Sequence, residues 1–430
     1  MKTDGWIKCH LRDIIYIKHG FAFKGEYFKD SPPGEILLTP GNFAIGGGFK
    51  GDKYKYYKGP VPGDFVLNEG NLLIAMTDLS KNGDMLGYPA IVPRSDQGKF
   101  LHNQRLGKVI IKDESVVTIE FLNYLLRTRE YRHEVLSSAT GSTVRHTSPD
   151  RIGAYEFLLP PIAEQRKIAN LLGCLDDKIE LNRRMNETLE AIARTIFKSW
   201  FIDFDPVRAK AEGEQPFGMD EETAALFPSE FEDSELGEIP KGWEIGTVEK
   251  EYKLTMGQSP PGSTYNEEGK GTQFFQGRTD FGFRYPKPRV YCIAPTRFAE
   301  PGDTLVSVRA PVGDVSMAKT RCCVGRGLAA LRHKSGSRSY TFYSMKALHR
   351  GFSLFESEGT VFGCINKQGF SSLKIVIPPD ELVAKFESLV APMDQGIENN
   401  INQNKSLTDI RDMLLPKLLS GEIRVPVEAD

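Results

Sequence analysis

The residues best suited to binding chemistry lie between positions 270 and 350, where 15 lysines and arginines accompany four acidic residues. Most of these cations are arginines, and aromatic side chains are interleaved with them. A planar guanidinium can clamp a phosphate or read the edge of a guanine. The mixture is typical of nucleic-acid surfaces, although a solvated basic face has the same composition. The DNA-binding candidates in this segment are Arg278, Arg284, Arg289, Arg309 and Arg326.

The first 160 residues carry a weaker signal of the same kind. Lys50, Lys53 and Lys55 follow a glycine-rich turn, and tyrosines are interleaved with them. This pattern predicts lysines on one face of a strand, where they either contact DNA or guard an exposed sheet edge. Both interpretations stay open.

Two polar loops recur just before the last strand of each half. Residues 142–148 include Arg145, and residues 363–368 include Lys367. These two cations join the DNA-binding candidates. The alternative is that the loops merely close their domains.

No catalytic motif accompanies these candidates. Gly46, Gly48 and Gly51 match a dinucleotide-binding spacing, but a segment rich in Lys and Tyr follows them, so we predict a loop. The Asn/Asp-Pro-Pro-Phe/Tyr tetrapeptide of adenine methyltransferases is absent, and the seven histidines do not cluster with carboxylates. The six cysteines form no Cys-x-x-Cys pair. We therefore expect binding rather than catalysis, with no catalytic residue and no metal site.

The net charge of −2 hides a segregation along the chain. Residues 1–160 carry a net charge of +3 and residues 241–379 carry +9, whereas residues 206–240 carry −8 and residues 380–430 carry −5. The two globular segments are thus positive, as a polyanionic partner requires. No apolar run is long enough to span a bilayer, and the first residues lack the apolar core of a signal peptide. We expect a cytoplasmic protein without a membrane partner.

The chain contains an internal repeat. Residues 140–200 and 359–418 align at a constant offset of 218, which places Asp176 on Asp394 and two asparagines of the first copy on two of the second. Upstream, the match is looser. A repeated unit predicts a pseudo-dimer, which suits a target with two halves. The alternative is a duplicated fold whose copies have drifted apart.

Short apolar runs bounded by Gly, Pro, Asn and Asp predict β-rich globular halves, and the fold class is therefore α+β. The expected strands are Glu35–Leu38, Leu72–Met76, Lys108–Ile111 and Thr304–Val308. A helix is expected over Ser115–Glu134, with a counterpart around Ser339–Arg350.

A helix of about 40 residues is predicted after Pro160-Pro161 and again after Pro378-Pro379, because apolar residues recur there in steps of four and three. Two asparagines interrupt the apolar seam of each helix at equivalent positions. They are Asn182 and Asn186 in the first helix and Asn400 and Asn404 in the second. A buried asparagine fixes the register of a coiled coil. We infer that the two helices pair in antiparallel fashion. The alternative is that each helix packs on its own domain and the asparagines face water.

Three phrases of this sequence resemble the specificity subunit of type I restriction–modification enzymes. They are Leu-Pro-Pro-Ile-Ala-Glu-Gln-Arg-Lys-Ile at 159–168, Leu-Asp-Asp-Lys-Ile-Glu-Leu-Asn at 175–182 and Leu-Leu-Pro-Lys-Leu-Leu-Ser-Gly-Glu-Ile at 414–423. The second helix entrance, residues 380–386, lacks the Glu-Gln-Arg phrase of the first. The two partner contacts need not be equivalent.

The resemblance covers nearly the whole chain and implies its layout. The expected parts are a target-recognition domain at 1–160, a spacer helix at 161–205, an acidic connector at 206–240, a second target-recognition domain at 241–379, a second spacer helix at 380–424 and a tail at 425–430.

The resemblance further implies that each domain reads half of a bipartite, asymmetric duplex, while the helices set the gap. Two modification subunits would dock on the chain and carry S-adenosylmethionine, and motor-nuclease subunits would join through the complex. The chain itself would bind no cofactor. Two alternatives remain: a specificity subunit of a solitary adenine methyltransferase, or a two-headed nucleic-acid-binding adapter that reads no sequence.

Overall fold

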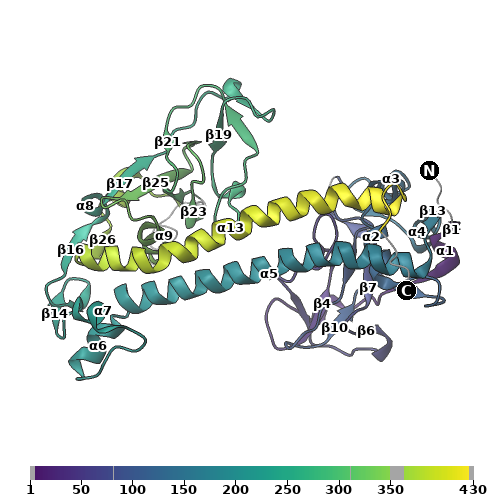
Figure 1. The fold of residues 1–430 in the computed structure, drawn as a ribbon, viewed down its shortest axis with the longest axis horizontal. Helices are drawn as coiled ribbons and strands as arrows, with labels where there is room; N and C mark the ends of the chain where they lie inside the picture. Colours follow the sequence, from purple (N-terminus) through teal and green to yellow (C-terminus); the bar gives the residue numbers. More distant parts are fainter. Residues whose placement is uncertain (1–4, 81, 310, 349–362, 426–430) are drawn as a thin grey trace. The chain divides into compact units, whose positions relative to one another are not determined.

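The computed structural model describes residues 5–80, 82–309, 311–348 and 363–425 (Figure 1). The chain forms two compact units, one of residues 1–181 and 403–430 and the other of residues 182–402. Several sequence expectations fall outside the described residues, namely the repeated segment Gly359–Phe362, Arg350 and positions 426–430 of the tail.

Three sheets build the body of the first unit. A two-stranded sheet has the order β1-β13, a five-stranded sheet β3-β5-β4-β10-β6, and a four-stranded sheet β2-β11-β7-β9. In chain order, these strands are β1 (Ile7–His10), β2 (Ile15–His19), β3 (Phe28–Lys29), β4 (Glu35–Leu38), β5 (Lys55–Tyr57), β6 (Val66–Leu67), β7 (Leu72–Ala75), β9 (Pro89–Ile91), β10 (Phe100–His102), β11 (Leu106–Ile111) and β13 (Glu156–Leu159). A small fourth sheet joins β8 (Thr77–Asp78) to β12 (Arg145–His146).

The body of the second unit repeats these strand orders. The sheets are β16-β26, β18-β20-β19-β24-β21 and β17-β25-β22-β23. The strands are β16 (Glu244–Thr247), β17 (Tyr252–Met256), β18 (Tyr265–Asn266), β19 (Thr272–Phe275), β20 (Val290–Cys292), β21 (Phe298–Ala299), β22 (Thr304–Val308), β23 (Val312–Met317), β24 (Cys322–Val324), β25 (Leu328–His333) and β26 (Lys374–Ile377). The predicted internal repeat and the α+β class are therefore confirmed.

The single helix expected over Ser115–Glu134 is instead two helices, α2 (Ile119–Leu125) and α3 (Arg129–Ser137). The Thr128 hydroxyl explains the break, because it accepts a hydrogen bond from the Tyr131 amide and donates one to the Leu125 carbonyl oxygen. A threonine in this role begins a new helix. Among the described residues, the other short α-helices of the two bodies are α1 (Leu11–Ile14), α4 (Pro149–Gly153), α8 (Val248–Glu251), α9 (Arg338–Ala347) and α12 (Lys367–Ser371).

The two long helices are α5 (Ile162–Phe201) and α13 (Asp380–Leu419), each of 40 residues. Both end earlier than the expected positions 205 and 424. After α5, Phe204 adopts a left-handed backbone with φ of 56° and opens α6 (Asp205–Ala211). The acidic connector then contains α7 (Glu221–Ala225) and the hairpin β14 (Phe231–Ser234)–β15 (Gly237–Pro240). It therefore has secondary structure of its own.

Contacts within each unit show that α5 and α13 pair in antiparallel fashion, as predicted (Figure 1). In the second unit, the side-chain amide of Asn400 donates to Asn186 Oδ1 at 2.9 Å. In the first unit, the amide of Asn404 donates to the Ile179 carbonyl oxygen at 3.1 Å. Asn182 and Asn186 are buried, so these two asparagines do not face water. Their role in fixing the register remains a prediction.

Each body packs its core against its own portion of the helix pair. The first core includes Leu172 of α5 and Leu418 of α13. The second includes Phe197 of α5 and Phe386 of α13, whose ring centroids lie 5.5 Å apart. Burying one such side chain contributes about 1.5–3 kcal/mol. Among the described residues, no helix has the length and apolar run that a bilayer crossing needs.

The fully buried His102 generates a testable pH dependence. Its Nε2 lies 2.9 Å from the Leu106 carbonyl oxygen, and burial lowers the pKa of the ring to about 4. An unfolded histidine has a pKa of about 6.5. Below that pH, His102 binds a proton in the unfolded chain but not in the folded chain. The free energy of unfolding therefore falls as the pH drops from about 6.5 towards 4.

We expect this effect to lower the free energy of unfolding by about 2 kcal/mol at about pH 5. His102→Gln keeps a donor for Leu106 but cannot titrate in this range. Denaturant unfolding at neutral and acidic pH should therefore show a smaller loss for the variant than for the parent. Equal losses would contradict the role of His102.

Candidate nucleic-acid interface

The predicted lysines of the first unit lie on an ordered loop and at the start of a strand. Lys50, Lys53 and Lys55 are all exposed. The buried Asn42 holds the loop, because its side-chain amide donates to the carbonyl oxygens of Lys50 and Lys53. Strand β5 lies between β3 and β4, so Lys55 does not guard a sheet edge. Contact of these lysines with DNA remains a prediction.

The repeated polar loop of the first unit meets the segment that follows β7. Arg145 pairs with Asp78 in the β12–β8 ladder, and the Thr77 hydroxyl lies 3.2 Å from His146 Nδ1. The buried carboxylate of Asp78 accepts the Ser80 and Met85 amides at 2.7 and 2.5 Å, which holds these two residues close to β8. Arg145 is half-buried at this junction.

The second unit brings the corresponding segments together. Arg309, just after β22, forms an isolated bridge with Cys364 in the repeated loop. Two residues further on, the side chain of Asn366 caps α12 by accepting the Gly369 amide at 2.8 Å. The exposed Lys367 begins that helix. Each polar loop was predicted from its own residues, but its contact with the segment that follows the third strand of its sheet was not predicted.

The other arginine candidates of the second unit are exposed, with one exception. Arg278 is paired with Asp314, Arg289 lies 3.3 Å from Asp280, and Arg326 is exposed beside β24. The pair of Arg278 and Asp314, whose side chains are 50% and 38% exposed, is worth only about 0–1 kcal/mol, so the guanidinium of Arg278 is able to exchange partners. Contact of all three arginines with DNA remains a prediction.

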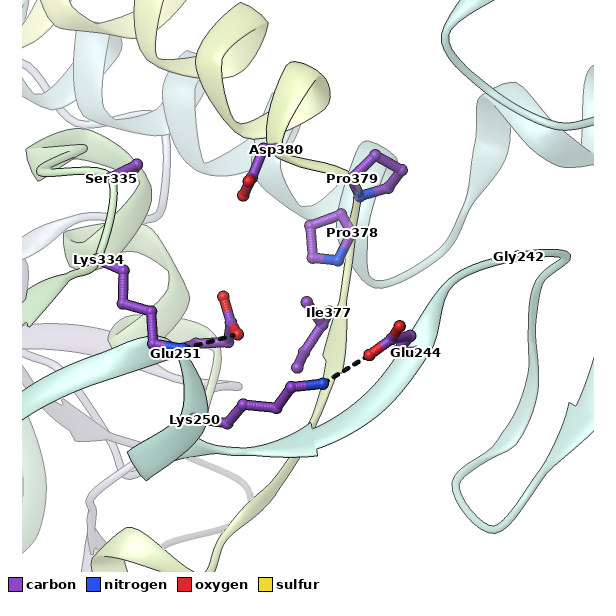
Figure 2. Close-up of a pocket in the computed structure, with 10 residues that line it drawn as sticks. All are labelled: Gly242, Glu244, Lys250, Glu251, Lys334, Ser335, Ile377, Pro378, Pro379 and Asp380. Carbon is purple, nitrogen blue, oxygen red and sulfur yellow. Dashed lines mark hydrogen bonds and ion pairs between the residues drawn. The ribbon is translucent and has the colours of Figure 1, made fainter.

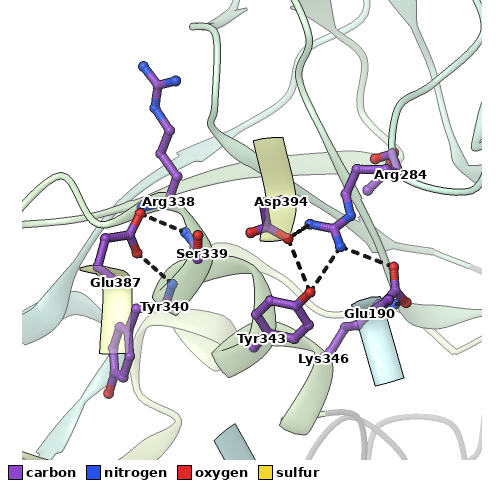
Figure 3. A network of polar contacts seen from close by, with 10 residues as sticks. Glu190, Arg284, Arg338, Ser339, Tyr340, Tyr343, Lys346, Glu387 and Asp394 are labelled. Carbon is purple, nitrogen blue, oxygen red and sulfur yellow. Dashed lines mark hydrogen bonds and ion pairs between the residues drawn. The ribbon is translucent and has the colours of Figure 1, made fainter. Parts of the chain in front are cut away.

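Arg284 does not fit the DNA-binding set. Only 1% of its side chain is exposed, and it donates to Glu190 of α5 at 3.2 Å, to Asp394 of α13 at 2.7 Å and to Tyr343 of α9 at 2.9 Å (Figure 3). The expectation that it contacts DNA is corrected, because a guanidinium enclosed by these groups cannot reach a duplex.

Arg284 is the centre of a clamp between the second body and the helix pair. Its guanidinium lies 4.1 Å from the centroid of the Phe342 ring, and Lys346 is also paired with Glu190. Burial alone opposes the charge of Arg284, but Asp394, Tyr343 and Glu190 outweigh it and raise the pKa of the guanidinium. The arginine therefore stays charged, and the clamp contributes a fixed attachment.

The first unit has an equivalent clamp around Asp176, the repeat partner of Asp394. Its carboxylate accepts hydrogen bonds from Tyr124 at 3.0 Å, from Arg127 at 2.9 Å and from Arg411 of α13 at 2.7 Å. Burial raises the pKa of this carboxyl, but the two arginines outweigh burial and lower it. The tyrosine and the aspartate recur in both clamps, whereas the arginines come from different elements.

Backbone contacts reinforce both attachments. The carboxylate of Glu387 on α13 accepts the first three amides of α9, those of Arg338, Ser339 and Tyr340, at 3.0–3.2 Å (Figure 3). A carboxylate at a helix N-terminus is favourable, because four amides there lack helical partners. In the first unit, Gln165 of α5 accepts the Thr118 amide ahead of α2 at 3.2 Å.

A hollow of about 590 Å³ lies at the start of α13, between β16, α8 and the end of β25 (Figure 2). Its lysines face carboxylates, since Lys250 lies 2.6 Å from Glu244 and Lys334 lies 3.7 Å from Glu251. The hollow therefore offers no surplus charge to a phosphate, and we do not assign it to the DNA interface.

Comparisons with known proteins agree on one family. A family model described as the type I restriction modification DNA specificity domain matches residues 3–191. The putative type I restriction enzyme MjaX specificity subunit of Methanocaldococcus jannaschii is 33% identical, over 71% of this chain and 68% of that protein. The HindI specificity subunit of Haemophilus influenzae is 28% identical, over 80% of this chain and 87% of that protein. A crystal structure of a type I system S subunit from M. genitalium shares the fold, with a TM-score of 0.57 at 16% identity over 96% of both chains.

The clamp makes a prediction about stability. Arg284→Met leaves the Glu190 and Asp394 carboxylates without their shared cation, and loss of one partner of a buried ion pair costs about 3–5 kcal/mol. Lys287→Met is the matched control, because Lys287 is exposed on the same loop. Its effect should stay below about 1 kcal/mol. Denaturant unfolding measures both, and equal effects would contradict the clamp.

Proposed function

The chain belongs to the specificity subunits of type I restriction–modification enzymes, and from this premise we propose that it directs such a complex to a bipartite DNA target. Each body would read one half of an asymmetric sequence. The helix pair would set the unread gap. The chain would act without catalysing a reaction, since the chemistry would belong to its partner subunits.

The observation that supports this proposal most directly is the pairing of one scaffold with two different surfaces. The two bodies share their strand orders. At equivalent junctions, however, the first pairs Thr77 with His146 and Asp78 with Arg145, whereas the second pairs Arg309 with Cys364. Base edges in the major groove are distinguished by the donors and acceptors of individual side chains. Different side chains on one scaffold suit two unlike half-sites.

The clamps support the spacer role of the helices. A helix of 40 residues is about 60 Å long. Successive turns of a duplex are about 34–36 Å apart. Because each body is held on the helix pair by a buried charge network, a change in helix length would be passed on to the distance between the half-sites.

The helix α5 has exposed apolar side chains that suit the docking of a protein partner. Within the second unit, Met185 and Ile192 are exposed by 41% and 42%. A groove of about 660 Å³ is lined by Ile192 and by side chains that include Ala191, Thr195 and Ile196. We propose that one modification subunit docks here. S-adenosylmethionine would bind in the modification subunits, and restriction subunits would join through the complex.

The two alternatives differ from this proposal in measurable ways. A subunit of a solitary methyltransferase would give methylation without a restriction subunit. An adapter that reads no sequence would bind all duplexes of one length equally. The side chains at the two junctions differ, and this difference favours sequence reading over the adapter.

The first prediction from this proposal concerns the methylation map of the source cell. Deleting the gene should abolish adenine methylation at one split motif with a fixed gap, because the modification subunits would no longer be directed to that sequence. Arg309→Ala should relax or abolish only the half-site read by residues 241–379. An unchanged map with the modification subunit still present would contradict the proposal.

The second prediction concerns the gap. One heptad inserted into α5 before Asn182, with a second heptad at the facing position of α13 before Gln403, keeps Asn404 with Ile179 and Asn400 with Asn186 and lengthens the pair by about 10 Å. That length corresponds to about three base pairs. Methylation mapping should show the same half-sites with a longer gap. The same heptad placed in the connector at Glu214 is the control, and altered half-sites would contradict the spacer role.

A further inference from the structure

Beside the second clamp, cationic side chains from three elements surround a hollow of about 520 Å³. Arg194 belongs to the long helix α5, Lys346 to α9, and Arg278 to the short turn that follows β19. The remaining lining residues are Phe281, Gly282, Gly313, Asp314 and Val315. All of them lie within the second unit.

The charges around this hollow do not balance. Arg278 is paired with Asp314, and Lys346 is paired with Glu190. Arg284 takes Asp394 and shares Glu190. These three cations thus match three carboxylates. Arg194 is exposed and has no ion-pair partner among the described residues, so the hollow has one positive charge in surplus.

The two paired cations are also able to donate to an incoming anion. The side chain of Arg278 is 50% exposed and that of Lys346 is 27% exposed. Their present carboxylate partners do not use every donor, because a guanidinium has five N–H groups and an ammonium has three. An anion of phosphate size would therefore meet donors from three directions, whereas the paired hollow at the start of α13 offers no such surplus.

The position of the hollow identifies the anion. Gly313 and Asp314 lie in β23, in the same β-hairpin as Arg309, and Arg278 is itself a DNA-binding candidate. A duplex that contacts these arginines presents backbone phosphates to the hollow. Phosphate contacts make up half or more of the hydrogen bonds in protein–DNA complexes and fix the register of the protein.

We propose that Arg194, together with Arg278 and Lys346, seats a backbone phosphate of the bound duplex. The spacer helix α5 would then be part of the DNA-binding surface and would not only set the distance between the two bodies. This inference rests on the proposed function, because it takes duplex DNA as the partner. The contact would fix the position of the duplex without reading its sequence.

The test uses the full chain co-expressed with its modification subunits, and short duplexes of mixed sequence and of target sequence as probes. Arg194→Gln should weaken binding to both duplexes by the same factor. It should also reduce the slope of log K against log salt by about 0.9, the value for one lost phosphate contact. Arg194→Lys should retain the parent slope, since any cation neutralises a phosphate.

Lys198→Gln is the matched control, because Lys198 is also an exposed cation of α5 in the second unit but lines neither the hollow nor the apolar groove. It should leave the slope unchanged. An Arg194→Gln slope equal to that of the parent or of the control would overturn the inference, and so would a loss confined to the target duplex. Equal binding of both duplexes by the parent would instead contradict the proposed function, while the slopes would still decide whether Arg194 meets a phosphate.

Discussion

A carboxylate shielded from water beside the apolar seam of a helix needs a cation to neutralise it, and both halves of the molecule are built around this requirement. Asp176 and Asp394 occupy the same position of the repeat, and both are largely shielded from water. Each is neutralised by arginine and bonded to a tyrosine of the helix that follows the four-stranded sheet. Removing water from a charge is so costly that the partners must stay in place. The bodies are consequently held on the helices by specific contacts as well as by apolar packing.

The two clamps solve this problem with different arginines. In the first unit, Arg411 belongs to the opposite long helix and Arg127 to the link between α2 and α3. In the second unit, the arginine comes from the connection between β19 and β20, at Arg284. That connection also contains the exposed Arg278 and Arg289. The attachment of the second body and its candidate recognition loop are thus parts of one segment, whereas in the first body they are separate.

The sequence predicted the elements better than the contacts. Regular apolar spacing and the Pro-Pro entrances were enough to locate both long helices and their antiparallel pairing. The break between α2 and α3 was missed, because it depends on one hydroxyl, at Thr128, within an otherwise helical pattern. Arg284 was misassigned for a deeper reason. An arginine has the same composition signal whether it faces DNA or fills a buried clamp, and only the tertiary positions of Glu190 and Asp394 distinguish the two. The one sequence feature that pointed to a buried clamp was the alignment of Asp176 with Asp394 in the repeat, since each aspartate on a long helix needs a cation.

The division of the chain into units has a consequence for synthesis on the ribosome. The second unit is one continuous stretch, residues 182–402, but the first is closed by residues 403 onward. Leu415 and Leu418 complete its core, and Arg411 and Arg424 neutralise Asp176 and Glu164. Domains generally fold in the order in which they emerge. Here the order is reversed. The first unit is synthesised first but cannot complete its core until the last segment of α13 has been made, whereas all residues of the second unit are present before that.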